Sequence, residues 1–232
     1  MSTVLGIITA RSGSKGIKNK NIYKFNNKPL LYYTIDFAKK LPFLNKLILS
    51  TDSKKYLKIA NQYYNFENQL RPKYLSGDNI KTIDVIKYEI NKLKKEGEIY
   101  DIIIVFQPVC PFRRKKTFIK AYNLINKKKT DSVITLKKVK DHPLKMYKMN
   151  NKYIKNLFYQ NNEQKSFMPR QKLERFYSRQ GSMYMFRKEL LKKNQLISSK
   201  TIGIEVFGKY TLNLDSNEDL ILAKNYFKKK WN

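Results

Sequence analysis

Two kinds of apolar pattern alternate along most of the chain. One is a short, unbroken apolar run, which is typical of a strand buried on both faces of a sheet. The other places apolar residues every three or four positions, which is typical of an amphipathic helix. These patterns predict strands at residues 4–10, 46–51, 101–106, 132–136 and 182–186, and helices at 29–41, 81–95, around 118–125 and after Asp215.

The alternation predicts an α/β fold of three layers, in which helices cover both faces of a mostly parallel sheet. In such folds ligands bind at the carboxyl ends of the strands, where Arg11, Asp52 and Gln107 fall. A chain of 232 residues is of ordinary size for one domain, and no linker interrupts the pattern. We therefore interpret residues 1–232 as a single domain.

Residues 137–180 break this rhythm. The stretch is rich in Lys, Asn, Gln and Tyr and has no clear helical period. It is too long for a plain loop inside a compact domain. We therefore expect a protruding excursion, such as a hairpin arm or a dimerisation segment.

A basic loop with two glycines follows the first predicted strand. Gly13 and Gly16 allow backbone N–H groups to approach an anion, and Arg11 and Lys15 add full positive charges. The loop matches neither the P-loop pattern nor the Gly-x-Gly-x-x-Gly pattern of dinucleotide-binding turns. It is therefore predicted to bind phosphate in another kind of α/β fold.

The segment 107–113, Gln-Pro-Val-Cys-Pro-Phe-Arg, directly follows the predicted central strand. Its two prolines fix a rigid turn, and the amide of Gln107 offers the donor and acceptor that a pyrimidine edge requires. Arg71 lies in a turn-rich loop and is either a surface residue or a contact to phosphate or base. Thr82 opens the next helix, where it is either a helix cap or a nucleotide contact.

Near the C-terminus, strand periodicity places Asn213 and Asp215 on one face, so that their oxygens can converge on one Mg²⁺ ion. Ser216 and Asp219 have the spacing of a capping box, so Asp219 is assigned to helix capping. The arginines at 170 and 179 are the minority cation of the chain and can bind carboxylate or phosphate in a bidentate fork, although both also suit a plain surface. Lys145 is open to the same two interpretations.

Composition narrows the functional classes. The net charge of +31 suggests a polyanion partner such as nucleic acid, but the lysines are spread over the whole chain and outnumber the arginines that base recognition favours. One cysteine and one histidine argue against a zinc site of the Cys/His type. Cys110 is interpreted as a packing residue, and His142 as structural with a general-base role left open. No membrane-length apolar run or signal peptide is found, so we expect a cytoplasmic protein.

Several of these motifs, in this order, resemble the cytidylyltransferases that activate sialic acids and related nonulosonic acids. The resemblance covers essentially the whole chain. It implies a nucleotide-diphospho-sugar transferase-like fold, and a homodimer whose protruding segment completes the sugar site of the partner. The motifs are Ala10–Gly16, Asn19–Asn21, Lys28–Leu30, Gln107–Arg113, Pro143–Lys145, Pro169–Gln171, Arg179–Tyr184 and the terminal motif with Asp215.

The resemblance implies a role for each matching residue. Arg11, Lys15 and Asp215 are the implied catalytic residues, and Asp215 with Asn213 is the implied Mg²⁺ site. Lys145, Arg170 and Arg179, with Gln107, are implied to hold the nonulosonic acid and nearby phosphate. The implied CTP-binding residues are Arg11, Ser14, Lys15, Lys20, Asn21, Arg71, Thr82 and Gln107.

The chain departs from the family pattern at three places. Asn213 stands where the family usually has an aspartate, which removes a charge from the metal site. Gln180 precedes Gly181 where the family has Asn-Gly, and Val109-Cys110 replaces the usual Thr-Ser between the prolines. These departures leave open a different sugar or a weaker enzyme.

Together these observations predict a CTP-dependent nucleotidyltransferase. The anomeric hydroxyl of the sugar attacks the α-phosphorus of CTP in line, and pyrophosphate leaves. Asp215 or a metal-bound hydroxide is favoured over His142 as the base. The alternatives are a transferase of the same fold for another sugar, such as an 8-carbon keto-acid sugar, and a basic protein that binds nucleic acid.

Overall fold

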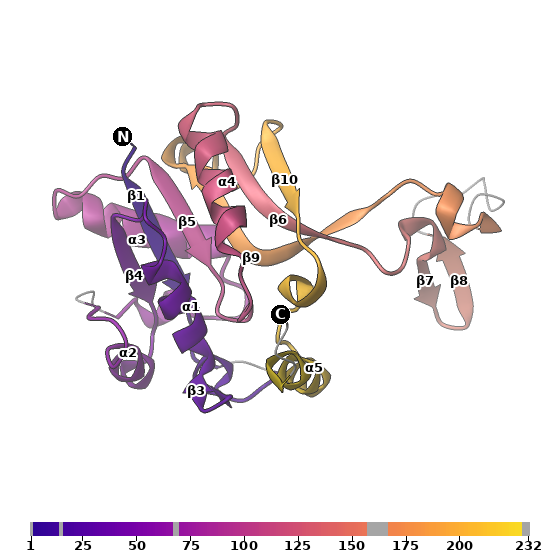
Figure 1. Ribbon diagram of the computed structural model, residues 1–232, viewed down its shortest axis with the longest axis horizontal. Helices are drawn as coiled ribbons and strands as arrows, with labels where there is room; N and C mark the ends of the chain where they lie inside the picture. The colour runs from indigo at the N-terminus through magenta and orange to yellow at the C-terminus, as the bar shows by residue number, and fades with distance from the viewer. Residues whose placement is uncertain (1, 14–15, 67–69, 157–166, 229–232) are drawn as a thin grey trace.

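A six-stranded sheet forms the centre of the protein (Figure 1). The computed structural model describes residues 2–13, 16–66, 70–156 and 167–228. The strand order is β10-β6-β9-β5-β1-β4. The strands of this sheet are β1 (Val4–Thr9), β4 (Lys46–Ser50), β5 (Ile102–Phe106), β6 (Ser132–Lys138), β9 (Tyr177–Arg187) and β10 (Thr201–Glu205).

The sheet is mostly parallel, as the sequence predicts. β1 runs parallel to both β4 and β5, and β10 runs parallel to β6. β9 is antiparallel to its neighbours β5 and β6. The helices are α1 (Leu30–Lys39), α2 (Lys54–Ala60), α3 (Thr82–Lys95), α4 (Lys115–Asn126) and α5 (Asn217–Lys228), with short 3-10 turns η1 (Lys20–Ile22), η2 (Lys73–Leu75), η3 (Pro143–Lys145), η5 (Arg170–Lys172), η6 (Lys188–Lys193) and η7 (Gly208–Thr211).

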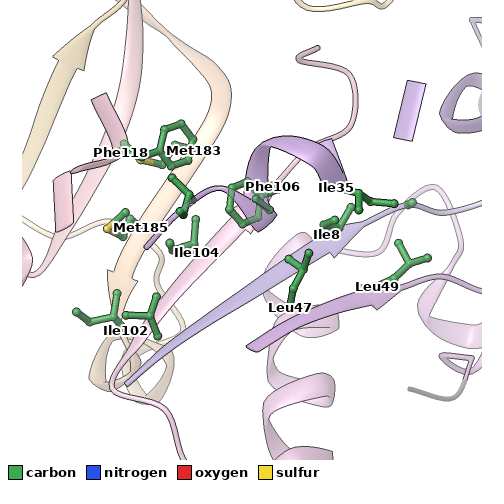
Figure 2. Close-up of a cluster of buried hydrophobic side chains, with 14 of the residues drawn as sticks. Ile8, Ile35, Leu47, Leu49, Ile102, Ile104, Phe106, Phe118, Met183 and Met185 are labelled. Carbon is green, nitrogen blue, oxygen red and sulfur yellow. The ribbon is translucent and has the colours of Figure 1, made fainter. Parts of the chain in front are cut away.

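Alternate residues of the central strands face two separate apolar layers, which explains why these strands read as unbroken apolar runs. On β5, Ile102, Ile104 and Phe106 pack in the layer that α1 and α4 cover (Figure 2). Ile103 and Val105 pack in the opposite layer, which α3 and η6 cover. The apolar stripes of the helices therefore meet the sheet from both sides, and the predicted three-layer α/β architecture is confirmed.

A third apolar cluster joins a segment near the start of the sequence to a segment near its end. Phe25 and Leu30, from the β2–β3 hairpin and the start of α1, pack against Leu214 and Leu220 near α5. The strands of that hairpin are β2 (Lys24–Phe25) and β3 (Lys28–Pro29). This packing brings the terminal motif beside the loop that follows β1.

Two parts of the sheet differ from the sequence-based expectation. β9 begins at Tyr177 rather than Ser182, so Arg179 and Gln180 belong to the sheet and not to the excursion predicted at 137–180. The first three residues of β9 are at least partly exposed, so they form no apolar run. The apolar pattern therefore did not predict this part of the strand. β10 was not predicted, since it is an edge strand whose residues are only half-buried or exposed.

The segment between β6 and β9 contains a small hairpin that lies away from the sheet (Figure 1). Its strands are β7 (Tyr147–Asn150) and β8 (Tyr153–Asn156). Met149 lies opposite Ile154 in this hairpin, and the two side chains are 72% and 63% exposed. In the described ranges, no helix is both long and apolar enough to span a membrane.

Candidate functional site

A cavity of about 450 Å³ opens at the carboxyl ends of β1 and β5. This is the edge at which α/β sheets bind ligands. The cavity wall combines polar and charged side chains from five separate segments of the chain. Eight residues predicted from the sequence line it: Arg11, Lys20, Asn21, Arg71, Thr82, Gln107, Asn213 and Asp215.

Hydrogen bonds to neighbouring segments hold the loop that follows β1. Asp52, just past β4, accepts hydrogen bonds from the backbone N–H and the hydroxyl of Ser12, at 2.8 and 2.6 Å. Burial alone would raise the pKa of Asp52, but the hydrogen bonds from Ser12 outweigh burial and lower it. The buried Asn21 donates from Nδ2 to the carbonyl of Arg11 at 3.0 Å. Asn21 therefore both lines the cavity and holds the backbone of the loop through this hydrogen bond.

The same loop contacts the terminal motif directly. Lys20 Nζ lies 2.7 Å from Asp215 Oδ1. A Cβ at Gly16 would lie 2.7 Å from the backbone oxygen of Asp215, closer than side chains are found, so this position requires glycine. The structure thus places Asp215 next to the basic loop, although 195 residues separate it from Lys20 in the chain.

Two arginines of the cavity wall occupy different environments. Arg11 is partly exposed and lies 2.6 Å from Asp78 Oδ1. Arg71 is 5% exposed, donates from Nε to Ser76 Oγ at 3.0 Å, and has its backbone N–H bonded to the carbonyl of Thr51. Burial lowers the pKa of Arg71, although a guanidinium stays protonated at neutral pH. Arg71 is therefore not the surface residue that one interpretation of its loop suggested.

Thr82 is the first residue of α3 and does not act as the helix cap. The capping position is Lys81, whose side chain makes no cap hydrogen bond. The capping interpretation of Thr82 is therefore not supported. Its position in the cavity wall is consistent with the other interpretation, a contact to a nucleotide.

Arg113 anchors the turn that carries Gln107. Its guanidinium donates to the carbonyl of Gln107 at 2.6 Å, to the carbonyl of Ser182 at 3.3 Å and to Thr34 Oγ1 at 3.0 Å. Burial lowers the pKa of Arg113 to about 10, so it remains charged at neutral pH. Arg113 is therefore held inside the fold by its neighbours rather than solvated. An arginine in a lysine-rich chain, at the end of a proline-fixed turn, was the available signal.

Asp219 has the capping role predicted for it. Its Oδ2 accepts hydrogen bonds from the backbone N–H groups of Asp215 and Ser216, both at 2.9 Å. The backbone N–H of Asp219 is 3.3 Å from Ser216 Oγ, which completes the capping box. The cap fixes the backbone at Asp215. The side chain of Asp215 is 63% exposed and lines the cavity.

The three departures from the family pattern meet in space. Asn213 Oδ1 accepts a hydrogen bond from Gln180 Nε2 at 3.1 Å, and the thiol of Cys110 also lies 3.1 Å from it. Gln180 and Cys110 are fully buried. Burial raises the pKa of the Cys110 thiol to about 11, so it is a neutral S–H donor. Asn213 was predicted as an oxygen ligand for Mg²⁺, but its oxygen is already engaged by two donors.

Of the residues implied to hold the sugar, Gln107 lines this cavity, whereas Lys145 and Arg179 do not. Lys145 lies in η3 and Arg179 in the outer part of β9, and both are exposed. Arg170 belongs to η5 by its backbone, and its side chain lies outside the described residues. Ser14 and Lys15 also lie outside the described residues, so their predicted contacts to phosphate stay predictions.

His142 is structural. Its Nδ1 accepts a hydrogen bond from the backbone N–H of Leu144 at 3.1 Å, which leaves the proton on Nε2. Nε2 lies 3.1 Å from the carbonyl of Glu174, and the ring packs edge-on against Phe176. Both nitrogens thus help to hold the segment between β6 and β9, which we call the arm, where it leaves the sheet. The general-base role left open for His142 is not supported.

The described residues offer little for a metal ion that the protein would bind alone. No three His, Cys, Asp or Glu side chains among them gather at one point. Mg²⁺, however, often binds to one or two carboxylates and completes its shell with substrate phosphates and waters. Asp215 fits that pattern, and Asn213 does not, because its amide oxygen faces Gln180 and Cys110.

Comparison with known proteins gives a family match and several relatives. A family model described as cytidylyltransferase matches residues 5–228. The chain is 27% identical over 234 residues to the post-translational flagellin modification protein B of Campylobacter coli, with 99% of this chain and 97% of that protein covered.

Two further relatives are much longer than this chain. A Helicobacter pylori protein named pseudaminic acid cytidylyltransferase and UDP-2,4-diacetamido-2,4,6-trideoxy-beta-L-altropyranose hydrolase is 30% identical over 204 residues, which are 87% of this chain and 38% of that protein. An N-acylneuraminate cytidylyltransferase of Escherichia coli is 37% identical over 121 residues, which are 52% of this chain and 28% of that protein. The chain therefore spans well under half of each of these two proteins.

Solved structures share the fold. CMP:2-keto-3-deoxy-manno-octonic acid synthetase, complexed with CTP, superposes with a TM-score of 0.68 at 15% identity over 99% of this chain and 100% of that one. A 4-diphosphocytidyl-2C-methyl-D-erythritol synthase superposes with a TM-score of 0.69 at 10% identity over 98% and 99%. At these identities the likeness shows the fold alone, and it confirms the predicted nucleotide-diphospho-sugar transferase-like architecture.

Proposed function

Because the chain belongs to the cytidylyltransferase family, we propose that it joins CTP to a nonulosonic acid to give a CMP-sugar and pyrophosphate. One observation carries the proposal beyond family membership. Six of the eight residues that the resemblance assigns to CTP come from separate segments and line one cavity at the ligand-binding edge of the sheet; the other two, Ser14 and Lys15, lie outside the described residues. Arg11, Lys20 and Arg71 give that cavity the positive charge that a triphosphate requires.

The proposed reaction is an in-line displacement at phosphorus. The anomeric hydroxyl oxygen of the sugar forms a bond to the α-phosphorus, and the bond from that phosphorus to the bridging oxygen of the β-phosphate breaks. The electron pair leaves on pyrophosphate. We assign Asp215 as the acceptor of the hydroxyl proton, because it is an exposed carboxylate of the cavity wall, whereas both nitrogens of His142 are engaged.

Cations in the cavity wall supply most of the proposed catalysis. Arg11 and Lys20 would bind phosphate oxygens and neutralise charge that develops on the leaving pyrophosphate. Each now pairs with a carboxylate, Asp78 or Asp215. A bound triphosphate would therefore compete with these carboxylates for the two cations. Arg113 holds the backbone of Gln107 at the cavity wall, and the amide of Gln107 would contact the pyrimidine.

We propose that Mg²⁺ assists this reaction and that Asp215 is its ligand from the protein. When bound, the ion would neutralise part of the triphosphate charge and lower the pKa of a coordinated hydroxyl. Asp215 suits this role because its carboxylate lies at the cavity and its backbone is fixed by the Asp219 cap.

For the sugar, we propose that Lys145, Arg170 and Arg179 bind the nonulosonic acid in a site completed by a second copy of the chain. Lys145 and Arg179 lie on or near the arm, outside the cavity. The hairpin of that arm presents Met149 and Ile154 on one exposed face, and pairing of such a face with another copy would bury it. A homodimer of this kind would bring the arm of one subunit to the cavity of the other.

Light scattering tests the dimer. We expect the natural protein to have twice the chain mass of 27.7 kDa. The double variant Met149→Ser/Ile154→Ser should shift toward monomer, whereas Ile221→Ser, which replaces an exposed apolar residue of α5, should not. A natural protein that is monomeric at the concentrations used for assay would remove this part of the proposal.

The names of two relatives suggest the sugars to test first, which are pseudaminic acid and N-acylneuraminic acid. Legionaminic acid is a third. Pure protein is incubated with CTP, Mg²⁺ and each acid in turn, and pyrophosphate release is measured. Release with one acid and not the others identifies the substrate. No release with any of the three acids would overturn the function proposed for these sugars.

We propose the cytoplasm as the compartment, since a sole cysteine leaves no disulfide within the chain.

A further inference from the structure

The cluster of Cys110, Gln180 and Asn213 fixes which atom Asn213 offers to the cavity. The backbone N–H of Ser182 can only donate, and it lies 3.0 Å from Gln180 Oε1. The Gln180 amide is thereby oriented, so that its Nε2 donor is the atom that faces Asn213 at 3.1 Å. The atom of Asn213 at that contact must therefore be the acceptor Oδ1.

The opposite orientation of Asn213 is disfavoured by the same neighbours. A flipped amide would set Nδ2 against the Nε2 of Gln180, so two donors would face each other. It would also remove the nearer of the two acceptors around the Cys110 thiol, which lies 3.1 Å from Asn213 Oδ1 and 3.7 Å from the carbonyl of Gln180. Because Gln180 and Cys110 are fully buried, water cannot readily replace the lost partner. Nδ2 is thus the polar group that Asn213 has left for a ligand in the cavity.

From this we infer that Asn213 is a hydrogen-bond donor to an anionic oxygen of the bound substrates, and that it is not a ligand of the metal ion. The inference rests on the proposed function. The anionic oxygen belongs either to a phosphate of CTP or to the carboxylate of the sugar acid. Both have the same chemistry toward an amide N–H, and both suit a cavity wall that already contains Arg11 and Lys20. Gln180 and Cys110 act as positioning residues for Asn213.

The substitution Asn213→Asp separates the two roles. The aspartate keeps an acceptor oxygen for Gln180 and Cys110, so the fold should be preserved. Its second oxygen replaces Nδ2, and this change turns a donor into a negatively charged metal ligand. A donor role predicts that the variant binds an anion less well and a metal ion better.

Titration calorimetry with CTP in EDTA measures the donor role without a metal ion. We expect Asn213→Ala to weaken CTP binding by about tenfold if the acceptor is a phosphate, and Asn213→Asp to weaken it further. Asn91→Asp makes the same charge change on the exposed surface of α3, outside the cavity, and should leave binding unchanged. If the acceptor is the sugar carboxylate, Asn213→Ala instead raises the KM for the acid about tenfold and leaves CTP binding as it was.

Binding of Mn²⁺ alone, followed by electron paramagnetic resonance, measures the metal role. Asn213→Ala should bind Mn²⁺ as the natural protein does, and Asn213→Asp should bind it about tenfold more tightly. Weaker Mn²⁺ binding by Asn213→Ala would show that Asn213 is a ligand and overturn the inference. So would an Asn213→Ala variant with unchanged CTP affinity and unchanged KM for the acid. If the natural protein binds no CTP, both the proposed function and this inference are overturned. If the natural protein is active and Asn213→Ala has the same CTP affinity and the same KM for the acid, only the inference is overturned.

Discussion

The nucleotide side of the proposed site and its sugar side are held by the fold in different ways. On the nucleotide side, Arg71 and Asn21 are buried, and the loop after β1 is bound through Ser12 to Asp52. On the sugar side, Lys145 and Arg179 are exposed and lie outside the cavity. A single chain therefore forms the cavity proposed for the nucleotide by its own packing, whereas Lys145 and Arg179 lie on its exposed surface. The following variants test this difference, from the largest expected effect to the smallest.

Asp215 lines the cavity and carries two proposed roles in the reaction, so its loss should be the most damaging. Asp215→Ala should lower kcat by roughly a hundredfold to a thousandfold, because it removes the proposed metal ligand and proton acceptor. Asp215→Asn, which keeps the size of the side chain, should be almost as inactive. Rates come from pyrophosphate release at saturating substrates, and circular dichroism checks the fold. Activity within a few-fold of the natural protein would remove Asp215 from both roles.

Arg11 tests the nucleotide side alone. Arg11→Ala should weaken CTP binding by about tenfold to a hundredfold, since a charged hydrogen bond to phosphate is lost. The KM for the sugar acid should change little. Calorimetry gives the CTP affinity, and Arg114→Ala serves as a control because Arg114 is exposed and does not line the cavity. Equal effects of the two variants would mean that overall charge, rather than the site, holds CTP.

Arg179 tests the sugar side in the same way. Arg179→Ala should raise the KM for the sugar acid by about tenfold and leave the CTP affinity unchanged. Arg175→Ala is the matched control, because Arg175 is an exposed arginine of the arm with no assigned role. A loss of CTP affinity in Arg179→Ala would contradict the separation of the two sides.

Asp52 tests how firmly the nucleotide loop is held. The pKa of Asp52 is lowered in the folded protein, so its contribution to stability is fully present above the unfolded pKa of about 3.9 and is lost as pH falls through the folded pKa. Asp52→Asn should reduce the free energy of unfolding by about 1 kcal/mol at pH 7, a modest value because the carboxylate is only partly buried. Urea unfolding at several pH values gives this difference, which should shrink below pH 4. A difference that does not depend on pH would show that the carboxylate charge is not what holds the loop.

Much of the fold follows from local patterns. The apolar runs of β1, β4 and β5 predict buried strands because both faces of each strand are covered. β10 and the first half of β9 escaped prediction because edge and half-exposed strands carry no continuous apolar run. The apolar pattern of a segment indicates how the segment is buried. Because β10 and the first half of β9 are buried on one side at most, their sequences do not have the pattern of a buried strand.

The candidate site also contains features that local patterns predict and features that they do not. Eight residues of the cavity were predicted. Arg11 and Gln107 were predicted because they follow strand ends, whereas Lys20 and Asn21 were predicted only through the resemblance to a family.

The contacts among Cys110, Gln180 and Asn213 were not predicted, since 33 to 103 residues separate the partners in sequence. Three substitutions that look independent along the chain form one hydrogen-bonded unit in the fold. Arg113 was missed for a similar reason, because its partners Thr34 and Ser182 lie on other elements.

The central claim is that this chain transfers CMP to a nonulosonic acid. Mass spectrometry of a reaction with CTP, Mg²⁺ and each candidate acid tests it most directly, with pyrophosphate measured in the same sample. We expect a CMP-sugar of the expected mass, formed in equal amount to pyrophosphate, and a rate of formation that is roughly a hundredfold to a thousandfold lower with Asp215→Ala. A folded protein that binds CTP but forms no CMP-sugar with any of the acids would contradict it.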